Sequence, residues 1–72
     1  MQHYRLIREL REDHDLSQPK AAKLFYVSKN TYIRYETGIT EPPFSFMIRL
    51  ADYYNVSLDW IAGRTDIKKI NP

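Results

Sequence analysis

The sequence predicts an all-α fold, a compact bundle of five short helices around one core. Three observations predict it. Apolar residues recur at three- and four-residue spacing along most of the chain, which is the period of an amphipathic helix. Residues suited to helix ends (Ser17, Ser28 and Gly38) separate these apolar stretches. Finally, no two stretches show the alternation of paired strands. The 72 residues are enough for one small domain.

The first half of the chain predicts three helices, over residues 3–14, 18–25 and 29–37. Ser17 is a suitable cap for the second helix, and Pro19 can occupy its first turn, where a backbone N–H is not needed. In the third helix Tyr32 and Tyr35 lie on one side, and Gly38 supplies the left-handed residue that ends it.

The second half predicts two more helices, over residues 44–54 and 58–62. The residues of the fourth helix that we expect to face inward are Phe44, Met47, Ile48, Leu50, Ala51 and Tyr54. Ser57 caps the fifth helix and Gly63 ends it. We therefore expect one domain over residues 1–66, followed by a short C-terminal tail over 67–72.

The second and third helices are joined too tightly to lie antiparallel. Only Tyr26 and Val27 connect them, so the two helices must cross at a steep angle, as in a helix-turn-helix. Such a crossing requires a small side chain at the contact, which Ala22 provides. Tyr26 stands in the turn, where a left-handed backbone would cost a non-glycine residue about 1 kcal/mol.

Charge separates this motif from the rest of the chain. Residues 17–38 contain four Lys or Arg residues and one Glu, a net charge of +3, between mildly acidic flanks. Lys20 and Lys29 stand in the first turns of their helices, where lysine is unfavourable by roughly 0.3–1 kcal/mol. A phosphate backbone facing these helix ends would make both lysines favourable, which indicates a polyanionic partner. The alternative is that the lysines stand there by chance and form a solvated face.

Several function classes are excluded or left without support. The chain has no cysteine, so it forms no disulfide and no Cys-ligated zinc site. His3 and His14 do not form a metal-ligand pattern, and we expect neither a metal nor a cofactor. No apolar run approaches the roughly 20 residues of a membrane span, and the first residues do not lead into a secretory signal. We find no catalytic constellation and expect no enzyme activity.

The motif residues together resemble the Cro/C1-type helix-turn-helix family, also called the XRE family. The matching segments are residues 5–11 (RLIRELR), 16–18 (LSQ), Ala22, 27–31 (VSKNT), 34–38 (RYETG), Pro42, 50–51 (LA) and 56–60 (VSLDW). The resemblance covers residues 4–66. It implies a lambda-repressor-like DNA-binding domain and a bacterial or phage transcriptional regulator, commonly a homodimer, that is cytoplasmic and associated with the nucleoid.

The third helix is then expected to read the major groove of double-stranded DNA. Lys29, Asn30, Ile33 and Arg34 share one face of this helix with Thr37. Lysine and arginine can bind guanine, asparagine can pair with adenine, and isoleucine can contact a thymine methyl group. Partial packing within the domain is the alternative for Ile33.

A second set of residues is expected to hold the DNA backbone. The candidate phosphate contacts are Ser17, Gln18, Lys20, Thr31, Thr37 and Thr40. Gln18 resembles the family's glutamine, which binds a phosphate and orients side chains of the recognition helix. Arg11 and Glu36 resemble the family's ion pair between the first and third helices, for which we favour a structural role.

The sequence departs from the family pattern at three points. Tyr26 stands where glycine is usual, and Tyr32 stands where Ile or Val is usual, so its phenol needs a partner or access to solvent. The loop residues 39–41 lack the basic residues common in relatives.

An exposed apolar patch would supply a dimer interface. We expect Phe46, Tyr53, Trp60 and Ile61 to form it, with Ile67 and Ile70 of the tail. The alternative function is an antitoxin or adaptor of the same fold, whose main role is to bind a protein partner. A small enzyme is the third hypothesis, and no sequence feature supports it.

Overall fold

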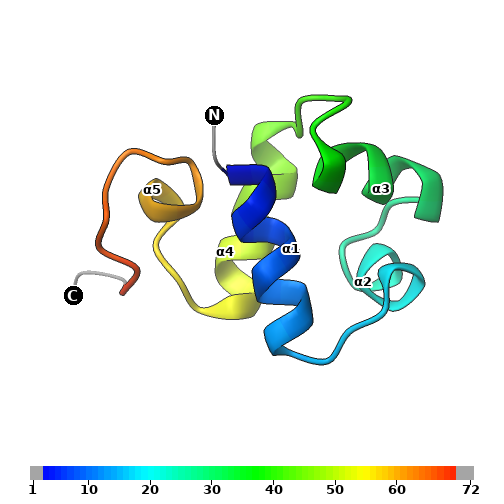
Figure 1. The fold of residues 1–72 in the computed structure, drawn as a ribbon, viewed down its shortest axis with the longest axis horizontal. Coiled ribbons are helices and arrows are strands. Elements are labelled where there is room, and N and C mark those ends of the chain that lie inside the picture. Colours follow the sequence, from blue (N-terminus) through cyan, green and yellow to red (C-terminus); the bar gives the residue numbers. More distant parts are fainter. Residues whose placement is uncertain (1–2, 70–72) are drawn as a thin grey trace.

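The computed structural model describes residues 3–69, with side chains from residue 5 onward. Its elements are α1 (His3–Asp13), α2 (Gln18–Leu24), α3 (Lys29–Thr37), α4 (Phe44–Tyr54) and α5 (Leu58–Ile61). In Figure 1 α1 lies at the centre, α2 and α3 form one end of the molecule, and α5 forms the other. The all-α fold is confirmed, and no expected helix bound differs from the observed one by more than one residue.

Serine side chains begin three of the helices, as expected. The Oγ atoms of Ser17, Ser28 and Ser57 accept hydrogen bonds from the backbone N–H three residues later, at 3.2, 3.1 and 3.2 Å. Each such cap contributes about 1 kcal/mol to helix stability. The helix beginnings are therefore determined by local sequence.

Three helices end in the same way, at a residue other than glycine. Asp15, Tyr26 and Asn55 have left-handed backbones with φ of 55, 61 and 56°. The apolar residue that follows each donates its N–H to a carbonyl five residues earlier: Leu16 to Arg11, Val27 to Ala22, and Val56 to Ala51. This is the Schellman arrangement, in which an apolar residue just after the helix packs back against the core.

Aromatic side chains dominate the core. Phe25, Tyr32 and Phe46 are fully buried, together with Ile7, Leu50 and Ile61. The rings of Phe25 and Phe46 meet edge to face with their centroids 5.9 Å apart, and Tyr35 contacts Phe46 at 4.7 Å. Edge-to-face contact adds about 0.5–1.5 kcal/mol per pair beyond the area buried.

The expected inward face of α4 is wrong in part. Phe44 and Ile48 are exposed, whereas Phe46, expected on the outside, is 1% exposed. The observed inward face consists of Phe46, Met47, Leu50, Ala51 and Tyr54. Both sides of this helix are apolar, so helical spacing alone allowed two registers. The contacts of Phe46 with Phe25 and Tyr35 select the observed one.

The expected apolar patch for dimerisation is corrected by the same burial. Phe46 and Ile61 are fully buried within the chain and cannot form an exposed surface. Trp60 is half-buried, with the Lys68 ammonium 5.3 Å from its ring centroid, and Tyr53 remains exposed. Within the tail, the Lys68 carbonyl accepts a hydrogen bond from the Ser57 N–H at 2.8 Å. Ile67 is exposed, and Ile70 lies outside the described residues.

Candidate nucleic-acid interface

The pair α2 and α3 forms the expected crossed arrangement. The two helices pack against each other, and Figure 1 shows them crossing rather than running side by side. Ala21 and Ala22 of α2 are buried, and Ala22 is the small side chain expected at this crossing. Tyr26 adopts the left-handed conformation in the turn and is 81% exposed. The turn therefore has the left-handed geometry that glycine adopts without strain, and the backbone of Tyr26 is strained.

One side of α3 is buried and the other faces solvent. Tyr32 and Glu36 are buried. The residues expected to contact bases lie on the opposite side: Lys29, Asn30 and Arg34 are exposed and Ile33 is half-buried. The exposed side of α3 thus carries a lysine, an asparagine and an arginine, which are the side chains that read base edges.

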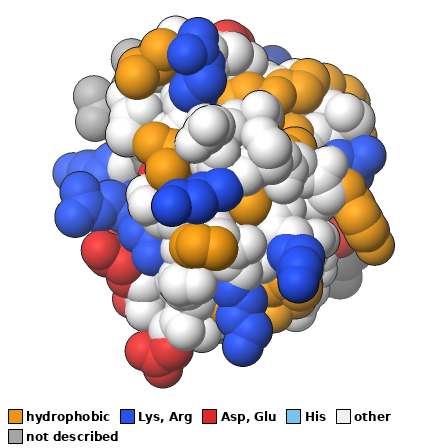
Figure 2. Space-filling model, turned by 90° about the vertical axis from the view of Figure 1, so that its right-hand side faces the viewer, with side chains coloured by type: hydrophobic (Ala, Val, Ile, Leu, Met, Phe, Trp, Pro, Cys, Tyr) orange, Lys and Arg blue, Asp and Glu red, His pale blue; other side chains and the backbone are white. Residues whose placement is uncertain are grey.

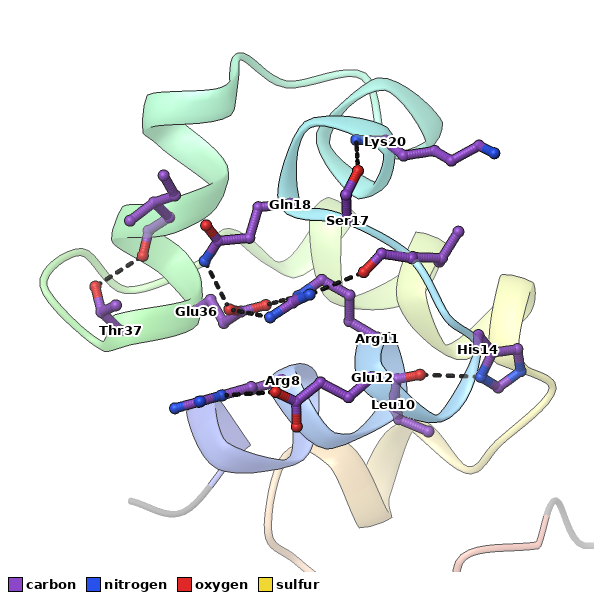
Figure 3. Close-up of polar contacts among 12 residues, drawn as sticks. Arg8, Leu10, Arg11, Glu12, His14, Ser17, Gln18, Lys20, Glu36 and Thr37 are labelled. Carbon is purple, nitrogen blue, oxygen red and sulfur yellow. Dashed lines mark hydrogen bonds and ion pairs between the residues drawn. The ribbon is translucent and has the colours of Figure 1, made fainter.

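The start of α2 carries the first group of expected phosphate contacts. Ser17 and Lys20 are exposed, and the Ser17 hydroxyl caps the helix by accepting from the Lys20 N–H. Gln18 is half-buried, and its Nε2 donates a 3.0 Å hydrogen bond to Glu36 Oε1. Figure 3 shows that the Gln18 side chain points toward α3, while the Lys20 side chain points away into solvent.

The threonines of the second group all have partners within the chain. Thr31 accepts a hydrogen bond from the Ser28 hydroxyl at 2.9 Å, and Thr37 donates to the Ile33 carbonyl at 2.7 Å. Thr40 accepts at 3.0 Å from Nε of Arg34. The last contact joins α3 to the following loop and positions the Arg34 guanidinium at the end of the helix.

Arg11 and Glu36 form an ion pair between α1 and α3. Nε of Arg11 lies 2.8 Å from Glu36 Oε2, and Nη2 lies 3.3 Å from Oε1. The two side chains are 13% and 3% exposed. Arg11 also donates to the Leu16 carbonyl at 2.8 Å, so the cluster joins the first three helices when Gln18 is included (Figure 3).

The environment of Glu36 favours its ionised form. Burial opposes ionisation, but the hydrogen bonds from Arg11 and Gln18 outweigh it, and the pKa of Glu36 lies below its ordinary value. The hydrogen bond to Glu36 likewise raises the pKa of Arg11. Glu36 is therefore an anion whose charge is compensated inside the domain.

Tyr32 is a buried neighbour of this cluster. From the sequence we expect only that its phenol needs a hydrogen-bond partner or access to solvent. Its hydroxyl is buried, close to Glu36, without a hydrogen bond of standard geometry to any described residue. Burial, followed by the proximity of Glu36, raises the pKa of Tyr32 far above its ordinary value. The phenol thus reaches the Arg11–Glu36 cluster rather than solvent.

A groove opens beside the ion pair, between α1 and the end of α3. We call it the α1–α3 groove; it measures about 570 Å³ and is lined by Arg5, Arg8, Arg11, Gln18, Glu36 and Thr37. Neither Arg5 nor Arg8 was predicted from the sequence as a site residue. The signal for them was present, because residues 5, 8 and 11 are spaced by three and share one side of a helix.

The end of the molecule formed by α2 and α3 is basic. Figure 2 shows Lys and Arg side chains spread across this face, with Asp and Glu side chains toward its edges.

Residues 5–69 contain no group of three or more His, Asp or Glu side chains arranged to hold a metal ion. In the part of the chain that the structure describes, no helix combines the length and apolar character required to cross a membrane.

The protein contains a helix-turn-helix module. It consists of the crossed helices α2 and α3, the left-handed turn between them and the polar face of α3. A helix-turn-helix family model matches residues 7–61, and the chain belongs to this family, which confirms the expected Cro/C1-type membership. The described fold agrees with a lambda-repressor-like domain.

Named relatives extend the comparison. The chain is 37% identical over 60 residues to the HTH-type transcriptional regulator YobD of Bacillus subtilis, covering 83% of this chain and 54% of the relative. It is 40% identical over 52 residues to the cryptic phage CTXphi transcriptional repressor RstR of Vibrio cholerae, covering 72% and 47%. The HTH-type transcriptional regulator ImmR of B. subtilis is 28% identical over 65 residues, covering 90% and 51%. The chain therefore spans about half the length of these relatives. No solved structure matches it.

Proposed function

We propose that the protein is a sequence-specific, double-stranded DNA-binding transcriptional regulator that acts as a repressor. The observation that carries the proposal is the exposed face of α3, which presents Lys29, Asn30 and Arg34 from a helix-turn-helix. Membership of the helix-turn-helix family supports it, and matched relatives are named as transcriptional regulators and, in one case, as a phage repressor.

In this function α3 enters the major groove. Lys29 and Arg34 donate to guanine O6 and N7, and Asn30 pairs with adenine through its amide. Ile33 contacts a thymine methyl group; its half-buried position leaves part of the side chain available. The hydrogen bond from Arg34 Nε to Thr40 leaves the terminal guanidinium nitrogens to face the DNA.

The DNA backbone is held around this helix. Lys20 is exposed at the start of α2 and pairs with a phosphate, and Ser17 and Gln18 contribute their side chains or backbone beside it. Thr31 and Thr37 lie in α3, and Thr40 lies in the loop that follows it; their hydroxyls turn toward phosphates. Each of these contacts positions the domain without selecting sequence.

Two copies act on a two-fold symmetric operator in the cytoplasm. Their α3 helices are then separated by about 34 Å, one turn of the duplex. Tyr53 and Trp60 are the residues of the expected interface that keep exposed surface. Occupation of a promoter by the dimer blocks polymerase, so repression requires no metal, cofactor or catalytic step.

Selection from a random double-stranded DNA pool at about 50 and 200 mM salt tests this proposal. We expect enrichment of a two-fold symmetric sequence and a steep loss of affinity at the higher salt. Salt-sensitive binding without enrichment would contradict the base contacts of α3. Absence of binding at both salt concentrations would contradict DNA binding and favour the antitoxin or adaptor alternative. An Asn30→Ala variant selected in parallel is the matched control for sequence reading.

A further inference from the structure

The α1–α3 groove is lined by positively charged side chains that take no part in the DNA contacts proposed for α2 and α3. Arg5 and Arg8 are exposed on α1, one turn apart and on one side of the helix. Both line the groove together with Gln18 and Thr37, two of the residues assigned to the DNA backbone. The groove is thus continuous with the proposed phosphate contacts and extends them toward α1.

The net charge of this lining is positive. Three arginines and one glutamate line it, and Arg11 neutralises the glutamate, because the Arg11 and Glu36 atoms approach to 2.8 Å. Glu36 is also 3% exposed and offers little negative surface. The charges that remain toward solvent are those of Arg5 and Arg8.

The existing partners of these two arginines hold them weakly. Nε of Arg5 lies 3.5 Å from Glu9, and Nε of Arg8 lies 3.2 Å from Glu12, both as exposed pairs four residues apart. Such pairs contribute little to stability, and the contact of Arg8 with Glu12 uses Nε. In Figure 3 the tip of Arg8 points away from Glu12, on the side of the molecule where Thr37 lies. The terminal guanidinium nitrogens are therefore positioned to bind a second acceptor.

We propose that the α1–α3 groove binds a phosphodiester group of the DNA backbone through Arg5 and Arg8. This inference rests on the proposed DNA-binding function and extends it to a residue pair on α1. A guanidinium presents paired N–H donors that match two phosphate oxygens, and Gln18 and Thr37 line the same groove. The contact lengthens the backbone footprint of each subunit without adding base recognition.

The test compares salt dependence on the selected operator. Each phosphate contact adds about 0.9 to the slope of log affinity against log salt. The two subunits on the operator each contribute one such contact, so for an Arg5→Gln/Arg8→Gln variant we expect the magnitude of the slope to be lower by about 2, and its loss of affinity between 50 and 200 mM salt to be about 10-fold smaller. An Arg5→Lys/Arg8→Lys variant retains the charge and is expected to keep the native slope.

The control is Arg64→Gln. Arg64 is exposed, pairs with Asp59 at 3.7 Å and lies outside the groove, so its loss leaves one unpaired carboxylate just as each test substitution does. We expect it to keep the native slope. Circular dichroism and thermal unfolding establish that each variant is folded.

Neutral methylphosphonate linkages placed singly along the operator identify the phosphate. One linkage in each half-site is expected to weaken binding by the unsubstituted protein and to have no further effect on the Arg5→Gln/Arg8→Gln variant. Equal slopes and equal responses of the two proteins would overturn the inference while DNA binding stands. Groove-dependent binding of inorganic phosphate with no response to any linkage would overturn it in favour of a free anion. If the unsubstituted protein binds no duplex, the proposed function fails and the inference fails with it.

Discussion

Arg49 lies over the ring of Tyr26, with its guanidinium carbon 5.4 Å from the ring centroid. This contact joins α4 to the turn of the helix-turn-helix. Arg49 also donates to the Phe25 carbonyl at 3.3 Å. The tyrosine occupies the left-handed position with φ of 61°, where glycine would be unstrained. The turn therefore combines backbone strain with a cation–π contact that partly offsets it.

Replacement of Tyr26 by glycine separates these two effects. In an Arg49→Gln background the cation–π contact is already absent, so Tyr26→Gly is expected to raise the free energy of unfolding by about 1 kcal/mol through relief of strain. In the native background the gain is expected to be smaller by about 0.5 kcal/mol. Urea denaturation of the four proteins measures both values. A loss of stability in the Arg49→Gln background would show that the turn is not strained.

The Arg11–Glu36 pair is expected to be costly to break from one side. Glu36→Gln leaves the guanidinium of Arg11 nearly buried without a counter-charge, and we expect a loss of about 3 kcal/mol. An Arg11→Met/Glu36→Leu variant removes both charges and is expected to lose less than the single change. Arg64→Gln, at an exposed pair, is expected to change stability by less than about 0.5 kcal/mol. Thermal and urea unfolding check the order; a double variant less stable than Glu36→Gln would contradict it.

The same carboxylate makes stability depend on pH. The pKa of Glu36 in the folded protein lies below its ordinary value of 4.5, so the unfolded chain binds the proton more tightly. The stabilisation is complete above pH 4.5 and is lost as the pH falls through the folded-state pKa. The difference in unfolding free energy between the native protein and Glu36→Gln is therefore expected to shrink between pH 7 and about pH 3. An unchanged difference would exclude Glu36 as the titrating group.

The helix bounds could be predicted from the sequence because their signals are local. Ser17, Ser28 and Ser57 cap helices, and Gly38 and Asn55 end them, through contacts within a few residues. The same holds for the exposed side of α3, whose members follow from helical spacing. These features depend on the period of the helix and not on which neighbour packs against it.

The remaining features depend on contacts between distant residues. The sequence of α4 has apolar residues on both sides of the helix, so helical spacing does not decide which side is buried. The contacts of Phe46 with Phe25 and Tyr35 decide it. The hydrogen bond from Gln18 to Glu36 joins residues 18 positions apart, and spacing along one helix cannot reveal it. The groove beside Arg8 is formed only when α1 and α3 are placed together.

The register of α4 yields a prediction for two phenylalanines two residues apart. Phe46 is 1% exposed and Phe44 is 68% exposed. Phe46→Ala is expected to destabilise the domain by about 3–5 kcal/mol, because it leaves a cavity among aromatic rings. Phe44→Ala, the matched control, is expected to change stability by less than about 1 kcal/mol. Equal losses in urea denaturation would contradict the observed register.

Asn30 provides the sharpest test of the reading face. It is exposed on α3, so Asn30→Ala is expected to leave the free energy of unfolding almost unchanged. Loss of its amide removes the hydrogen bonds to one adenine, and operator affinity is expected to fall by about 1–3 kcal/mol. The loss is expected only on duplexes that contain this adenine. A duplex in which that base pair is replaced is expected to bind the native protein and the Asn30→Ala variant equally. Lys23→Ala, an exposed change further along α2, is expected to preserve the preference at that position. If Asn30→Ala instead weakened every duplex by the same factor, the side chain would contact the backbone and not a base.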